Sequence, residues 1–203
     1  MFHFDLMGIL YRLPAIFIAF SFHEFAHAYV AYKLGDPTPK NQGRLTLDPF
    51  AHIDILGFIL LLFMGFGWAK PVRVNPASFK NRRRDDILVS LSGPIMNLAL
   101  GIIFLCIKYF IPVYNDVFDG IINSIIYINI LLAMLNILPF PPLDGYHILK
   151  NIFFYRHGGA FWKFERYGFL IMLLLIVTNT LSAIIVPMVN FIIFTTYNIL
   201  NLF

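Results

Sequence analysis

Two histidines and a glutamate lie close together inside an apolar segment near the start of the chain, which reads His23-Glu24-Phe25-Ala26-His27. On a helix, residues four positions apart share one face, so both imidazoles can bind the same zinc ion. Glu24 can then accept a proton from a water on that ion. In a soluble chain this motif would be weak evidence. Ionisable residues within a membrane helix are rare and usually functional, so here the motif predicts a catalytic zinc site.

The composition of the chain is that of a membrane protein. Of its 203 residues, 59% are hydrophobic and 13% are charged, whereas about a quarter of the residues in a soluble domain are charged. Mean hydropathy is +0.76. We expect an all-α polytopic membrane protein, with residues 1–203 forming a single integral-membrane domain. No cleavable signal pattern precedes the first apolar run, so the first helix is expected to remain. The single cysteine, Cys106, should be a buried packing residue.

Apolar runs predict about four to six membrane segments. Residues 7–32, 87–111 and 121–138 are each long enough to cross the bilayer. The run 168–203 is longer than one span needs. Thr-Asn-Thr at 178–180 and Pro187 interrupt this run, which predicts either one kinked helix or a tight pair of helices.

Residues 55–67 form a shorter apolar run that contains three glycines. The run is too short for a standard span, so we expect a re-entrant or short-strand element between the first and second full spans. Its backbone is predicted to be non-helical and to return beside the zinc. The glycines at 57, 65 and 67 would allow its sharp turns.

The distribution of basic residues predicts the topology. Thirteen of the 15 Lys and Arg lie in 33–54, 68–86 and 139–166, whereas 112–120 carries two aspartates and no basic residue. The positive-inside rule makes the three basic loops cytoplasmic and 112–120 external. If 55–67 crossed the bilayer, 33–54 would face outward, so the charges favour the re-entrant reading. Cytoplasmic loops also explain the net charge of +4 without a nucleic-acid partner.

A third zinc ligand is expected at Asp144, because a catalytic zinc usually has three protein ligands and one open position. Asp144 ends a proline-rich stretch at 136–144, and irregular backbone at membrane depth belongs beside a cavity. Two alternatives remain open. Asp144 could instead cap a helix that begins near 145, and His52 could be the third ligand. His147 follows Asp144 too closely to face the same way easily. The other two histidines, His3 and His157, look like surface residues.

Three stretches together resemble the site-2 protease family of intramembrane zinc metalloproteases. They are His-Glu-Phe-Ala-His, Ser-Gly-Pro-Ile-Met-Asn at 92–97, and Asn-Ile-Leu-Pro-Phe-Pro-Pro-Leu-Asp-Gly at 136–145. Residues 43–54 and 67–76 resemble the small members of that family. The resemblance covers nearly the whole chain. It implies one zinc ion held by His23, His27 and Asp144, with Glu24 as the catalytic base.

The sequence departs from the family pattern at a few points. Neither a PDZ insertion nor a C-terminal nucleotide-binding pair is evident, although some relatives have them. Asp48 stands where the family has Asn in a Thr-Leu-Asn-Pro stretch.

These features predict an enzyme that hydrolyses peptide bonds of membrane-spanning proteins within or near the bilayer. A prokaryotic plasma membrane and regulated intramembrane proteolysis are expected. Asn97 and Asn136 are candidates for binding the substrate backbone or the oxyanion, although each could instead link helices. His52 is a third candidate substrate contact. Residues 55–76 offer an edge for an extended substrate.

A zinc transporter and an inactive binding protein are the alternative functions. The scarcity of ionisable groups in the outer halves of the helices disfavours the first, and the presence of Glu24 disfavours the second.

Overall fold

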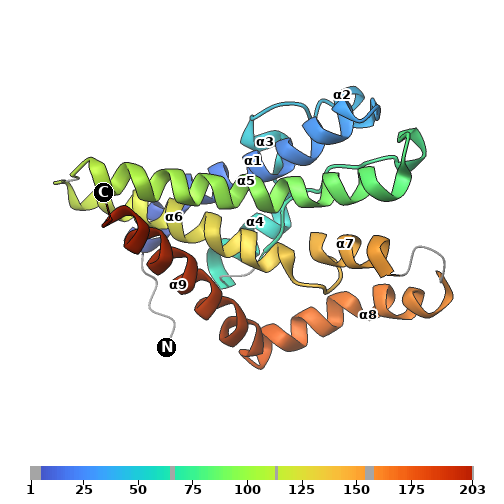
Figure 1. The fold of residues 1–203 in the computed structure, drawn as a ribbon. Coiled ribbons are helices and arrows are strands. Elements are labelled where there is room, and N and C mark those ends of the chain that lie inside the picture. The colour runs from blue at the N-terminus through green and yellow to red at the C-terminus, as the bar shows by residue number, and fades with distance from the viewer. Residues whose placement is uncertain (1–5, 65–66, 113, 154–157, 203) are drawn as a thin grey trace.

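The computed structural model describes residues 6–64, 67–112, 114–153 and 158–202, most of which are helical (Figure 1). The long helices are α1 (Leu6–Lys33), α5 (Arg82–Phe110), α6 (Asp116–Ile137), α8 (Gly158–Val177) and α9 (Thr180–Leu200). The shorter elements are α2 (Thr38–Asn41), α3 (Pro49–His52), α4 (Ile55–Met64), the 3-10 turn η1 (Pro76–Ser78) and α7 (Asp144–Phe153).

Four of the described helices, α1, α5, α6 and α9, are long and apolar enough to cross a membrane. The expected all-α membrane architecture is therefore confirmed. Helix α5 begins at Arg82, before the predicted 87, because the basic run is itself helical. Its first turn is stabilised by the Asn81 side chain, which accepts a hydrogen bond from the backbone N–H of Arg84.

The C-terminal apolar run is a pair of helices and not one kinked helix. Helix α8 ends at Val177 and α9 begins at Thr180, with Asn179 between them in the left-handed conformation at φ 59°. Asparagine tolerates this backbone conformation better than most residues, which explains why the chain can turn here. Pro187 lies inside α9 and does not end it. In Figure 1, α8 and α9 form a V.

Helices α1, α5 and α6 form the centre of the fold, and each packs against the other two. Alongside them, α9 packs on α5 and α6 (Figure 1). The main hydrophobic cluster lies there and includes the fully buried Leu105, Ile130 and Val189. Cys106 was predicted to be buried. It is only partly buried and packs against the edge of this cluster.

The element between α1 and α5 returns to its starting point. Ile53 and Ala69 form an antiparallel bridge, and the N–H of Lys70 donates to the carbonyl of His52 at 2.8 Å. The prediction of a non-helical backbone was wrong, because residues 55–64 form α4. A helix pairs its own backbone groups, so this short segment needs fewer outside partners than an irregular loop would.

Two glycines allow this return. A Cβ atom on Gly57 would overlap the carbonyl oxygen of Trp68, and one on Gly67 would overlap the carbonyl oxygen of Gly57. The two sides of the element therefore meet backbone to backbone. The third glycine of the run, Gly65, lies outside the described residues.

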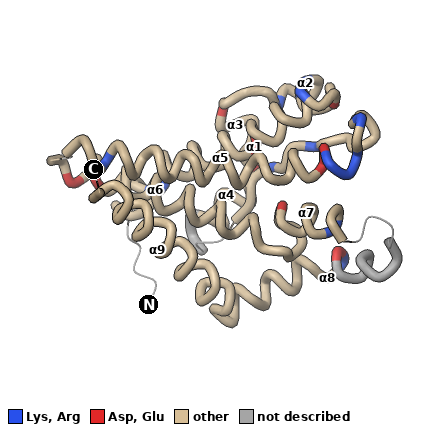
Figure 2. The backbone as a smooth tube through the Cα atoms, in the orientation of Figure 1, with Lys and Arg blue, Asp and Glu red and all other residues tan. Residues whose placement is uncertain are grey.

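Charged residues gather at the ends of the long helices. Figure 2 shows Lys and Arg around α2, the beginning of α5 and α7, whereas the central parts of the long helices carry almost no charge. Within the described residues, the Lys and Arg around these elements therefore gather toward one end of the molecule. The acidic residues around 116–119 lie at the opposite end.

We predict opposite labelling of the two ends of the molecule by a membrane-impermeant thiol reagent. In a Cys106→Ala background, single cysteines at Gln42 and Arg83 should react only from the cytoplasmic side, and a cysteine at Asp116 only from the external side. All three positions are exposed. Labelling of Gln42 and Arg83 from opposite sides would mean that the α4 element crosses the bilayer.

Candidate metal centre

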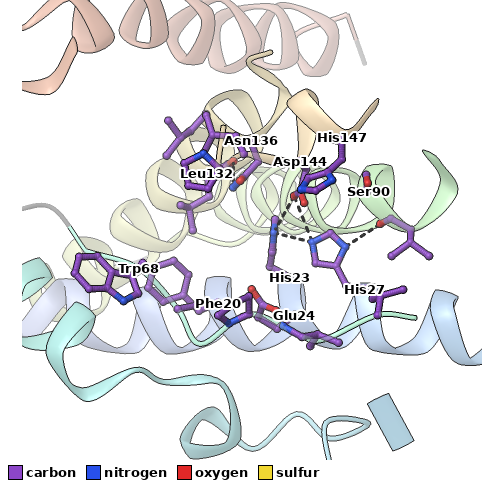
Figure 3. Close-up of a pocket in the computed structure, with 18 of the residues that line it drawn as sticks. Phe20, His23, Glu24, His27, Trp68, Ser90, Leu132, Asn136, Asp144 and His147 are labelled. Carbon is purple, nitrogen blue, oxygen red and sulfur yellow. Dashed lines mark hydrogen bonds and ion pairs between the residues drawn. The ribbon is translucent and has the colours of Figure 1, made fainter. Parts of the chain in front are cut away.

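Three side chains from two distant parts of the sequence converge on one point. His23 and His27 lie on successive turns of α1, and Asp144 begins α7. The two Nε2 atoms are 3.0 Å apart, and the Oδ2 atom of Asp144 lies 3.2 Å and 3.3 Å from them. Figure 3 shows the three groups pointing toward one another. The ligand atoms thus form a nearly equilateral triangle.

The other ring nitrogen of each histidine faces an acceptor on α5. The Nδ1 atom of His27 lies 2.8 Å from the carbonyl oxygen of Val89, and that of His23 lies 2.5 Å from Oδ1 of Asn97. A carbonyl oxygen cannot donate, so each neutral imidazole must carry its proton on Nδ1 and present a lone pair from Nε2. Hydrogen bonds of this kind typically orient metal-binding histidines.

The triangle fits a zinc ion. Three lone-pair atoms facing one another at about 3 Å repel unless a cation lies among them. Ligand atoms about 2.0–2.1 Å from a tetrahedral zinc are about 3.3 Å from one another, close to the observed separations. The Oδ2 atom of Asp144 is buried, and within the described residues it has no hydrogen-bond donor.

Space for an ion is available because residue 93 on α5 is a glycine. A Cβ atom at Gly93 would lie 2.5 Å from Nε2 of His27 and 2.7 Å from Nε2 of His23. Gly93 is part of the Ser-Gly-Pro-Ile-Met-Asn stretch. Its importance was not predicted, because a sequence does not show which helix faces the two histidines.

Glu24 lies in the same cavity and is 7% exposed. Its Oε2 atom accepts a hydrogen bond of 2.8 Å from the backbone N–H of Val72. This contact fixes the carboxylate beside the triangle without using a side chain as the donor. The role of Val72 could not be predicted from residue types, because every residue except proline offers the same N–H group.

The segment 67–76, which contains Val72, is held at several points. Arg44 donates to the carbonyl oxygen of Ala51 and, at 3.4 Å, to that of Lys70. Farther along, the N–H of Asn75 donates to Oδ2 of the fully buried Asp36 at 2.6 Å. The segment therefore has a defined path past Glu24.

A cavity of about 790 Å³ surrounds the triangle and Glu24. Its walls come from α1, the segment 67–76, α5, α6, α7 and α8 (Figure 3). Many of the lining side chains are apolar, among them Phe20, Trp68, Val89, Leu132, Leu135, Phe169 and Met172. The polar groups of the site thus occupy a mostly apolar chamber.

The remaining predicted site residues have different surroundings. Asn136 lines the cavity, and its Nδ2 atom donates to the carbonyl oxygen of Leu132. Asn97 and His52 are fully buried and are not among the described residues that line the cavity. The Nε2 atom of His52 lies 2.8 Å from the carbonyl oxygen of Thr46.

The other histidines lie away from the triangle or cannot be placed. His147 lines the cavity but does not belong to the cluster that could hold a metal. His3 and His157 lie outside the described residues. The alternative reading of Asp144 as a helix cap is compatible with the triangle, because a carboxylate in the first turn of α7 is also favourable there.

Comparisons with known proteins identify the family of the chain. Residues 113–179, which include Asp144, match the model of peptidase family M50. YwhC of Bacillus subtilis, named as a candidate zinc metalloprotease, is 41% identical over 89% of this chain and 86% of its own. MJ0611 of Methanocaldococcus jannaschii, named in the same way, is 32% identical over 73% of each chain. Rip2 of Mycobacterium tuberculosis is 30% identical over 82% of this chain and 66% of its own. No solved structure matches.

The chain therefore belongs to peptidase family M50, the site-2 protease family. It is an integral-membrane zinc metalloprotease, as the sequence predicted.

We predict that Gly93→Ala removes most of the bound zinc, because the new methyl group would occupy the space next to both Nε2 atoms. Gly101→Ala is the matched control. It lies on the same helix. Its Cβ would lie 2.5 Å from Cγ1 of Ile130, and none of its three nearest contacts is a histidine atom. Zinc per folded molecule, measured by atomic absorption, should fall to a small fraction in the first variant and stay near one in the second. Full zinc in Gly93→Ala would show that the ion lies elsewhere.

Proposed function

We propose that this protein hydrolyses peptide bonds of membrane-spanning proteins, within or near the bilayer of a prokaryotic plasma membrane. His23, His27 and Asp144 hold the zinc, and Glu24 is the base. The observation that carries the proposal is the triangle of three facing acceptor atoms with Glu24 beside it, inside a cavity walled by apolar helices. Such a cavity suits a substrate that arrives from lipid.

When bound, zinc lowers the pKa of a water toward 7 and polarises the carbonyl that is attacked. Glu24 takes the proton from that water and later delivers it to the leaving amine. Because the Val72 N–H occupies Oε2 of Glu24, we assign the proton transfer to Oε1. The low exposure of Glu24 limits competition from bulk water.

The substrate has to be locally extended, since a helix hides its carbonyl groups within its own hydrogen bonds. The segment 67–76 lines the cavity beside Glu24 and is the wall along which we place an extended substrate. Asn136 is the candidate side-chain donor to the substrate carbonyl or oxyanion, because it also lines the cavity. For Asn97 and His52, which do not line it, we propose positioning roles behind His23 and behind segment 67–76.

We predict that Glu24→Gln keeps its zinc and its fold but loses cleavage, because an amide cannot accept the proton. The loss should be at least about a hundredfold, the usual contribution of a general base. Purified protein in detergent would be tested with a model transmembrane peptide, alongside zinc analysis. Asp144→Ala is the comparison, and it should lose both zinc and cleavage. Substantial cleavage by Glu24→Gln would remove Glu24 from its assigned role.

A second prediction concerns the backbone donor to Glu24. Val72→Pro removes the N–H group, and a hydrogen bond to a charged group contributes about 1.5–3 kcal/mol. We expect kcat to fall roughly tenfold to a hundredfold with zinc content unchanged. Val72→Ala keeps the N–H and is the matched control, so its kcat should stay near that of the wild type. Equal losses in the two variants would assign the effect to the valine side chain.

A further inference from the structure

A chain of buried amides leads away from the candidate zinc site and was not anticipated from the sequence. Asn97 on α5 faces the Nδ1 atom of His23 through its Oδ1 atom, and its Nδ2 atom donates to Oδ1 of Asn129 at 2.9 Å. Asn129 lies on α6, and its own Nδ2 atom donates to the carbonyl oxygen of Ile125, also at 2.9 Å. Both asparagines are completely buried.

The two histidines differ in the kind of acceptor that faces their Nδ1 atoms. His27 faces a backbone carbonyl, whose position is fixed by helix α5 and which can only accept. His23 faces a side-chain amide, which could rotate by half a turn and present its NH2 group instead. In that orientation Asn97 would favour a proton on Nε2 of His23, which is the atom that faces the metal position. His23 therefore needs something that prevents Asn97 from turning over.

Two acceptors fix the orientation of Asn97. Its Nδ2 atom donates to Oδ1 of Asn129 and to the carbonyl oxygen of Ala19, the latter at 3.0 Å. Turning the amide over would place its oxygen against both acceptors and its NH2 group against the N–H of His23. Within apolar surroundings, unpaired or repelling polar groups are costly, so one orientation dominates.

Asn129 is fixed in the same way. Its donor is committed to Ile125, one turn earlier on α6, which leaves its oxygen pointing toward Asn97. Among the described residues, the one side-chain acceptor for Nδ2 of Asn97 is Oδ1 of Asn129, so this part of the arrangement depends on the residue type at position 129.

We propose that Asn129 is a positioning residue for the zinc site, which acts through Asn97 to keep His23 in the tautomer that binds metal. The proposal rests on the zinc ligands proposed above. Its alternative is that the two asparagines only hold α5 and α6 together, as polar residues in membrane helices often do.

The test is a measurement of zinc affinity by competition with a chelator, on the full chain in detergent. Groups that orient metal ligands typically contribute tenfold to a hundredfold in affinity, so Asn129→Leu should bind zinc about tenfold more weakly. Ser124→Ala is the matched control, because Ser124 lies on the same helix and bonds only to the carbonyl oxygen of Gly120 in that helix. It should bind zinc as the wild type does.

Repeating the Asn129→Leu substitution in a second variant separates an effect on the orientation of Asn97 from an effect on helix packing. In Asn97→Asp, the carboxylate has two oxygens and presents an acceptor to His23 in both of its rotated positions. It therefore does not depend on Asn129 for its orientation. Adding Asn129→Leu to that variant should change zinc affinity less than about twofold. An equal tenfold loss in both backgrounds would overturn the proposal and favour a packing role.

A third variant covers the case in which leucine is not tolerated at position 129. Asn129→Asp keeps an acceptor for Asn97 and should bind zinc as the wild type does, so a tenfold loss there would also overturn the proposal. His23→Ala tests the ligand set separately. Unchanged affinity in that variant would refute the ligand set itself, whereas lost zinc together with an unaffected Asn129→Leu would refute only the role of Asn129.

Discussion

The structure depends on where two imidazoles in an apolar helix direct their four ring nitrogens. The Nε2 atoms meet Asp144 from α7, and the Nδ1 atoms meet acceptors on α5. The hydrocarbon core of a bilayer offers no water as a hydrogen-bond partner, so the partners of polar groups there must come from the protein. The requirement brings α5 so close to α1 that residue 93 has room for no side chain. Helices α1 and α5 also each pack against α6.

The sequence was sufficient for the parts of the site whose spacing is local. His23, Glu24 and His27 lie within five residues of one helix, and Asp144 stands out as a lone carboxylate in a proline-rich stretch. Long apolar runs likewise predicted the spans. Relations between helices could not be read in this way. That Gly93 faces the histidines, or that Asn129 supports Asn97, depends on the rotation of α5 and α6 about their axes. The helix at 55–64 was missed because its glycines suggested turns, whereas Gly57 serves a close approach.

The cavity combines two kinds of wall. Helices α1 and α7 carry the candidate ligands, and α5 carries the hydrogen-bond partners of the two histidines. Rigid elements hold such groups most accurately. The segment 67–76 is a connecting element, yet it is fixed by specific bonds, such as those of Arg44 and Asp36. The proposed zinc ligands therefore lie on helices, whereas the wall proposed for an extended substrate is a connecting segment. The single-domain organisation of residues 1–203 stays a prediction.

The bond between Val72 and Glu24 has a consequence for the evolution of the site. Its donor belongs to the main chain, so nineteen of the 20 residue types at position 72 would supply it equally well. The side chain at position 72 is thus free to diversify under selection without disturbing the glutamate. Within such a family, the lining of the chamber could drift from one lineage to the next while the proton-transferring group keeps its orientation. Proline at position 72 is the one substitution that this freedom excludes.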